Sequence, residues 1–201
     1  MGLITTAAFI LATQMPPEGD FNPDSSLLSA EAGNPSKDRL AEIWNHIDNR
    51  LINQSDLWFD LGEFPRCVAL LQVQCAYSPD DYDVMTSLGW MLENIDRKEE
   101  AKSVYLDFGK RHPHEGDAMF ALGFMYSNAK DYDNAIKVLE PTLSLNVSPN
   151  TYRTLAKAYE RKKNYKDAIR VWELELKKYP DEDTAKNNIN RVKAKIAKGG
   201  N

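Results

Sequence analysis

Two consecutive segments of this chain align with each other residue by residue, and they decide the fold. Residues 82–115 read YDVMTSLGWMLENIDRKEEAKSVYLDFGKRHPHE, and residues 116–148 read GDAMFALGFMYSNAKDYDNAIKVLEPTLSLNVS. A small residue recurs at the same place, Ala101 in the first segment and Ala135 in the second. Working outward, Cys67 precedes them and Ala168 follows, at steps of 34, 34 and 33 residues. A period this constant over four units indicates a repeat protein.

Each repeat contains two runs with the spacing of an amphipathic helix. Large residues stand sixteen positions before the small ones, at Leu51, Met85, Met119 and Tyr152. A second set follows seven positions later, at Trp58, Leu92, Tyr126 and Tyr159. Spacings of three, four and seven place apolar side chains on one helical face. Each unit is therefore predicted to be two helices joined by a short turn, near Gly62, Asn94, Asn128 and Asn164.

These coupled positions resemble the tetratricopeptide repeat (TPR) family over about residues 48–182. The resemblance implies an all-α fold, a right-handed α-solenoid of about four helix–turn–helix units. We place the units at residues 48–81, 82–115, 116–148 and 149–182. Helical caps are expected at both ends of a TPR domain spanning residues 37–198, the C-terminal cap over residues 183–198. Residues 1–36 are predicted to be a separate leader-like or flexible segment.

Two places depart from the repeat pattern. Gln54 and Ser55 replace the usual Leu-Gly pair, which makes the first helix of the first unit the least well specified. Pro141 falls inside the second helix of the third unit, where proline removes a backbone hydrogen bond and crowds the preceding turn. We expect a kink at Pro141.

Charge is distributed unevenly along the chain. The net charge is −5, but residues 1–96 hold four basic and fifteen acidic side chains, whereas residues 97–201 hold twenty-one basic and fifteen acidic. The acidic balance argues against a nucleic-acid partner, because such binding rests on neutralising phosphates. The basic half favours an acidic partner or is a solvated helical surface. The sequence contains no apolar run of about 18 residues, so it predicts no transmembrane segment.

The N-terminal residues allow several interpretations. Residues 3–12 match the apolar region of a secretory signal in length, which favours an exported or periplasmic protein, but no Lys or Arg precedes Lys37. Gly2 and Thr6 fit a loose myristoylation pattern, so an N-terminal membrane tether is an alternative, as is a plain cytoplasmic tail. Whether residues 1–13 are cleaved, lipidated or retained stays open. Apolar side chains of residues 1–28 are also numerous enough to support self-association.

The sequence contains no motif of a known chemistry. It has no phosphate-binding loop, nucleophile elbow or metalloprotease helix. The His112-Pro113-His114 run lacks further ligands for a metal, and the acidic clusters precede helices, where carboxylates stabilise the helix dipole. Cys67 occupies a packing position. We therefore expect no enzyme activity, no cofactor and no metal.

The surface remains as the candidate for function. In the TPR family the first helix of every unit lines a concave groove. Mapped residue by residue, this implies a peptide-binding groove of Trp90, Glu93, Asn94, Phe120, Phe124, Asn128, Arg153, Lys157 and Arg161. Aromatic and arginine side chains are typical of interface hot spots, although the same rings could instead pack within the stack.

Two functional hypotheses follow from this surface. The first is a non-enzymatic adaptor or scaffold that binds a protein or peptide partner in the groove. The alternative is a regulatory or targeting subunit of a larger enzyme or assembly complex, held at a membrane by the N-terminus.

Overall fold

The computed structural model describes residues 37–181 and 183–199, which form helices and turns with no strand among them. The all-α expectation is confirmed. The chain divides into two compact units between Leu70 and Leu71, and each is described by itself. The expectations for residues 1–36, including export, the membrane tether and self-association, lie outside the described residues.

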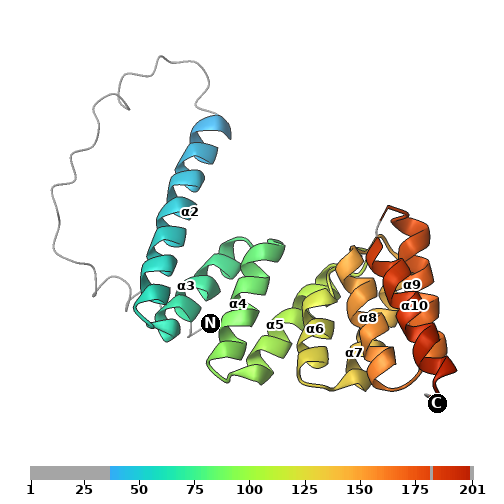
Figure 1. Ribbon diagram of the computed structural model, residues 1–201. Helices are drawn as coiled ribbons and strands as arrows, with labels where there is room; N and C mark the ends of the chain where they lie inside the picture. The colour runs from blue at the N-terminus through green and yellow to red at the C-terminus, as the bar shows by residue number, and fades with distance from the viewer. Residues whose placement is uncertain (1–36, 182, 200–201) are drawn as a thin grey trace. The chain divides into compact units, whose positions relative to one another are not determined.

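The expected N-terminal cap and the first helix of the first unit form one continuous helix, α2 (Lys37–Asp60) (Figure 1). No Gly or Pro occurs in residues 37–60, so nothing ends the helix between the two expected segments. Gly62, at a φ of 72°, reverses the chain into α3 (Phe64–Tyr77). The Cys67 thiol is fully buried there and donates to the Ser55 carbonyl oxygen at 3.5 Å. Cys67 therefore has the packing role predicted for it.

The remaining helices are α4 (Tyr82–Asn94), α5 (Lys98–Arg111), α6 (Phe120–Asn128), α7 (Tyr132–Leu139), α8 (Pro149–Arg161), α9 (Tyr165–Lys178) and α10 (Asp183–Ala197). They lie side by side as three consecutive pairs, α4 with α5, α6 with α7 and α8 with α9, followed by the single helix α10 (Figure 1). Within each pair a small residue lets the backbones approach. A Cβ atom on Gly89 would overlap the Tyr105 ring, and one on Gly123 would overlap Leu139. The recurring small residues of the sequence thus mark the closest helix contacts.

The turn inside each helix pair has the same geometry in all four units. One residue adopts the left-handed conformation in each turn: Gly62, Asp96, Lys130 and Lys163, with φ between 60° and 72°. The next backbone N–H then bonds to a carbonyl five residues earlier, as from Arg97 to Leu92 at 2.8 Å. This pattern is a Schellman motif, which satisfies the last carbonyls of the helix. Gly62 is itself the left-handed residue of the first turn. The other left-handed residues lie near the Asn positions named for the turns: Asp96 two after Asn94, Lys130 two after Asn128 and Lys163 one before Asn164.

The predicted kink at Pro141 is wrong, because the helix stops instead. Helix α7 ends at Leu139 after eight residues, whereas α5 and α9 have fourteen each. A short 3-10 helix, η2 (Glu140–Ser144), follows it and contains the proline near its start. Proline has no N–H to donate the next α-helical hydrogen bond, so the backbone stays helical at Glu140 but continues as a 3-10 helix and not as α5 does.

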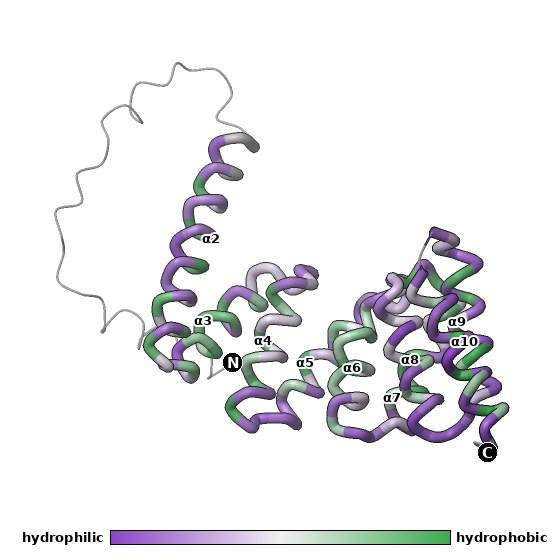
Figure 2. Tube along the Cα trace, viewed as in Figure 1, coloured by the Kyte–Doolittle hydropathy of each residue, from purple (hydrophilic) through white to green (hydrophobic). Residues whose placement is uncertain are grey.

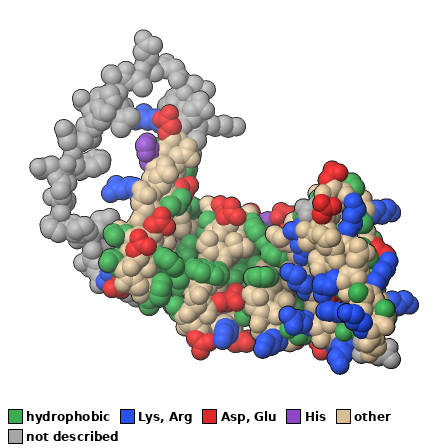
Figure 3. Space-filling model, in the orientation of Figure 1, with side chains coloured by type: hydrophobic (Ala, Val, Ile, Leu, Met, Phe, Trp, Pro, Cys, Tyr) green, Lys and Arg blue, Asp and Glu red, His purple; other side chains and the backbone are tan. Residues whose placement is uncertain are grey.

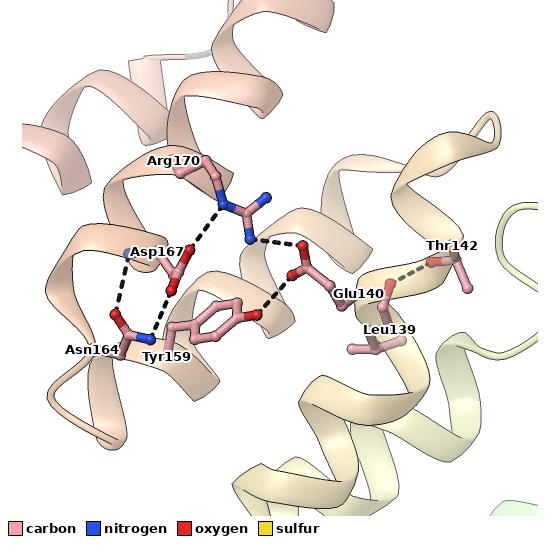
Figure 4. A network of polar contacts seen from close by, with 7 residues as sticks. All are labelled: Leu139, Glu140, Thr142, Tyr159, Asn164, Asp167 and Arg170. Carbon is pink, nitrogen blue, oxygen red and sulfur yellow. Dashed lines mark hydrogen bonds and ion pairs between the residues drawn. The ribbon is translucent and has the colours of Figure 1, made fainter.

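A polar network holds the chain where α7 gives way to η2 (Figure 4). The Glu140 carboxylate accepts a hydrogen bond from the Tyr159 hydroxyl at 2.9 Å and another from Arg170 at 2.7 Å. Arg170 also donates to Asp167 at 3.0 Å. Burial and the hydrogen bond to Glu140 raise the pKa of Tyr159 to about 12. Residues from α8 and α9 thus position the irregular end of the third unit.

Helix α10 lies within the residues expected to form a C-terminal cap, 183–198, and packs on α9. Its buried face consists of Ala185, Ile189 and Val192, and the first two of these belong to the apolar cluster that includes Trp172 of α9. The opposite face is hydrophilic (Figure 2). Gly199, with a φ of 86°, follows the helix and its N–H bonds to the Ile196 carbonyl at 3.1 Å. Helix α10 thus covers the apolar side of α9 with its own apolar face.

Candidate functional site

Equivalent positions of α4, α6 and α8 carry Trp90, Phe124 and Lys157, spaced 34 and 33 residues apart. Each follows directly after the small residue that packs on the second helix of its unit. Since successive residues of a helix lie about 100° apart, these side chains turn away from the partner helix. The side chains of Trp90 and Phe124 are 51% and 47% exposed. The repeat therefore presents two large aromatic rings on the surface of the first helices.

Phe120 lies one helical turn before Phe124, and the two rings stack. Their centroids are 5.7 Å apart with an interplanar angle of 28°. Phe120 is half-buried, whereas Phe124 is exposed. One ring thus forms part of the packing of α6 and supports the other, which extends to the surface.

The polar residues at the ends of α4 and α6 differ in their roles. The Glu93 carboxylate accepts from the Tyr105 hydroxyl at 2.9 Å, and burial together with this charge raises the pKa of Tyr105. The Asn94 side chain donates to the Trp90 carbonyl oxygen at 2.7 Å. Asn128, the last residue of α6, is exposed. Glu93 and Asn94 therefore stabilise the helix pair and the helix end, in addition to lying beside Trp90.

The predicted basic residues of α8 are not equivalent to one another. Lys157 and Arg161 are exposed. The Arg153 guanidinium instead donates through Nε to the Glu175 carboxylate at 2.8 Å, and the Glu175 side chain is completely buried in α9. Arg153 thus compensates a buried charge, which would be costly without a partner.

Helix α10 adds two basic residues that were not among the predicted groove residues. Arg191 donates two hydrogen bonds to the Glu160 carboxylate, at 2.6 and 2.8 Å, and Lys195 lies 3.5 Å from it. Burial alone would raise the pKa of Glu160, but the hydrogen bonds from Arg191 and Trp172 and the nearby positive charges lower it. Arg191 stands 34 residues after Lys157, so extending the period beyond the fourth unit would have found it. Basic side chains gather over this end of the chain (Figure 3).

The other groups considered for chemistry have structural partners. The His112 ring stacks on Phe108 with centroids 4.2 Å apart, and its nitrogens lie 2.9 Å from Glu115 and 3.1 Å from Asp80. Burial, followed by the charge of Asp81, raises the pKa of Cys75 to about 11, which keeps the thiol protonated. No cluster of three metal-ligating side chains occurs in the part of the chain that the structure describes.

Comparison with known proteins agrees with this geometry. A family model described as Tetratricopeptide repeat matches residues 117–140, which extend from the turn before α6 to the end of α7. Over these residues the chain is similar to the tetratricopeptide repeat family. Its matched segment contains both the stacked rings of α6 and the left-handed residue of the third turn. No protein sequence with a curated description matches this chain.

Solved structures show the same architecture. A crystal structure of MamA protein has 19% sequence identity and a TM-score of 0.57, and the match covers 75% of this chain and 82% of the solved MamA chain. MamA from Desulfovibrio magneticus RS-1 has 19% sequence identity and a TM-score of 0.54, and the match covers 76% of this chain and 85% of the solved MamA chain. TTC0263, a thermophilic TPR protein in Thermus thermophilus, has 17% sequence identity and a TM-score of 0.53, and the match covers 69% of this chain and 77% of the solved TTC0263 chain. At these identities the likeness shows the fold, an α-solenoid of TPR helix pairs.

Within the described residues, no helix has both the length and the apolar character that crossing a membrane requires.

Proposed function

We propose that this protein is a non-enzymatic adaptor that binds a peptide or a partner helix along α4, α6 and α8. The observation that carries the proposal is the exposure of Trp90 and Phe124 at equivalent repeat positions. Scattered single apolar residues are ordinary on a protein surface, but a repeated register of large rings is a feature of interaction sites.

The energetics favour a partner that covers the rings. Burying a large aromatic side chain contributes about 1.5–3 kcal/mol. Phe124 also stacks on Phe120, and a side chain that is restricted before binding loses less freedom on binding. A ligand with apolar side chains at helical or extended spacing would bury the exposed surface of both rings.

The same surface has a basic end. Lys157 and Arg161 of α8 are exposed, and Arg191 and Lys195 of α10 lie around Glu160 beside them. A ligand that places apolar groups on α4 and α6 would meet positive charge at α8. We therefore propose that this partner carries acidic residues at that end, which would make its association rate depend on salt.

The test is a capture experiment with a matched control. Wild-type protein, a Trp90→Ala/Phe124→Ala variant and a Leu174→Ala variant are used to recover partners from a native lysate. Leu174 is 37% exposed on α9, outside the proposed surface, so it controls for the loss of surface apolar area. We expect one or more proteins to be recovered by wild type and Leu174→Ala but lost with the double variant. Mass spectrometry identifies them, and circular dichroism checks that all three forms are folded.

The identified partner then permits a quantitative prediction. Phe124→Ala should weaken its binding by about 2 kcal/mol, or roughly thirtyfold in Kd, because truncating a central interface ring is costly. Isothermal titration calorimetry measures this change. Equal affinity of wild type and Phe124→Ala would remove the ring from the binding site and, with it, the proposed function.

A further inference from the structure

A second surface feature results from the early end of α7. In the 34-residue register, residues 141–145 correspond to residues 107–111 of α5, which are helical. In the third unit these residues form η2 and the extended Leu145 instead. A hollow of about 430 Å³ lies here, bounded by α5, α6, α7 and η2. Its apolar lining includes Leu106, Met119, Leu122, Val138, Pro141 and Leu145.

The hollow is separate from the aromatic surface. Leu122 lines it from α6 and lies two residues from both Phe120 and Phe124. Two residues correspond to about 200° around a helix, so Leu122 and the two rings are on opposite sides of α6. A ligand in the hollow would therefore leave the rings untouched.

The polar chemistry of the hollow is simple. Thr142 donates its hydroxyl hydrogen to the Leu139 carbonyl oxygen at 2.8 Å, and the Asn134 amide donates to Asp131 at 2.7 Å, so both donors have internal partners. Among the lining residues that the structure describes, the single charged side chain is Lys137, which is exposed. The lining is thus mostly apolar, with the uncharged polar side chains of Tyr126, Asn134 and Thr142, one positive charge and no negative charge.

We propose that this hollow docks a protein partner that inserts a large apolar side chain next to an acidic residue. The apolar walls suit the side chain, and Lys137 complements the carboxylate. Pro113, Lys137 and Pro141 at the rim are exposed, so the hollow is open on one side. Small-molecule sites enclose most of their ligand, whereas an open hollow receives a side chain presented by another protein surface.

Two short peptides test this proposal by NMR. The probes are acetyl-Glu-Trp-Glu-amide and acetyl-Lys-Trp-Lys-amide, titrated into the ¹⁵N-labelled full chain. We expect the acidic probe to shift the backbone amides around Leu106, Leu122 and residues 137–145. It should bind about fivefold more tightly than the basic probe, as one exposed charge pair allows. Lys137→Glu should reverse that order of affinity.

Three further variants keep the result interpretable. Leu106→Arg should abolish the shifts by placing a charged chain in the hollow, and its melting curve shows whether it folds. Lys177→Glu changes another exposed lysine, on α9, and should leave the order of affinity unchanged. Phe124→Ala should leave it unchanged too, which separates this proposal from the adaptor surface. Three outcomes would overturn the proposal. They are chemical shift changes confined to the face of Trp90 and Phe124, no chemical shift changes at all, and an order of affinity that Lys137→Glu does not change.

Discussion

Single residues with a left-handed backbone conformation set every turn between paired helices. The first turn uses Gly62, whereas the second, third and fourth use Asp96, Lys130 and Lys163 at the same repeat position. A side chain makes this conformation unfavourable by about 1–2 kcal/mol, and glycine avoids the cost. Three of the four turns would therefore be more stable with glycine at the left-handed position.

Replacing Lys130 by glycine should stabilise the protein. We expect Lys130→Gly to raise the free energy of unfolding by about 0.5–1 kcal/mol, because the relief of backbone strain exceeds the entropy that glycine adds to the unfolded chain. Urea denaturation followed by circular dichroism measures the change.

The matched control reverses the substitution in the first turn. A Cβ atom on Gly62 would meet nothing within 4 Å, so Gly62→Ala changes the backbone preference without a steric clash. It should destabilise the protein by about 1 kcal/mol. If Lys130→Gly failed to stabilise and Gly62→Ala had no effect, the left-handed conformation would not control these turns.

At the scale of the helices, ion pairs at the ends connect elements that are distant in sequence. Glu160, near the end of α8, is bound by Arg191 and Lys195 of α10 and by the Trp172 indole of α9. Its side chain is only 8% exposed. A carboxylate in this position joins three helices, and it is stable there only while it is ionised.

The contribution of Glu160 should depend on pH. Its pKa is lower in the folded protein than its ordinary value of 4.5, so its stabilising effect is complete above that value and is lost as the pH falls through the lower folded pKa. Glu160→Gln should reduce the free energy of unfolding by about 1–3 kcal/mol at neutral pH. The difference from wild type should then narrow in acid.

Denaturation curves over a range of pH values measure this difference. Glu173→Gln is the control, because Glu173 is exposed on α9 and its loss should change little. A difference between wild type and Glu160→Gln that stays constant from neutral pH into acid would contradict the role assigned to the ionised carboxylate.

For residues 71–199 as a whole, the free energy of unfolding is approximately a sum over contacts between neighbouring helices. A helix that covers the apolar face of its neighbour therefore contributes strongly to this sum. Helix α10 covers the cluster that contains Val171 and Trp172, both fully buried. Without that cover the fourth unit would expose its largest side chain.

Truncating the covering face should loosen the end of the stack. Ile189→Ala is expected to lower the free energy of unfolding by about 2–5 kcal/mol, the range for removing a large buried aliphatic side chain. Thermal unfolding followed by tryptophan fluorescence and circular dichroism reports the loss. Lys186→Ala, on the exposed face of α10, should unfold as wild type does. An equal melting temperature for Ile189→Ala and wild type would show that α10 is not a stabilising cap.

Most of the helix pairing and part of the candidate surface follow from the sequence by itself. The period identifies the units, because each repeat contacts mainly its neighbours and equivalent positions make equivalent packing contacts in each repeat. Gly89, Gly123 and Ala156 thereby predict the close helix contacts, and the residue after each one predicts the exposed row.

Only the tertiary structure decided the features that break the period. Pro141 marks a disturbance in the sequence, but the stop of α7 and the placement of η2 involve Glu140 contacts with Tyr159 and Arg170, 19 and 30 residues away. Arg153 likewise has a contact that its repeat position does not predict, because its guanidinium donates to the buried Glu175. Local periodicity determines where helices form, whereas polar contacts between distant residues depend on how the helices lie in space.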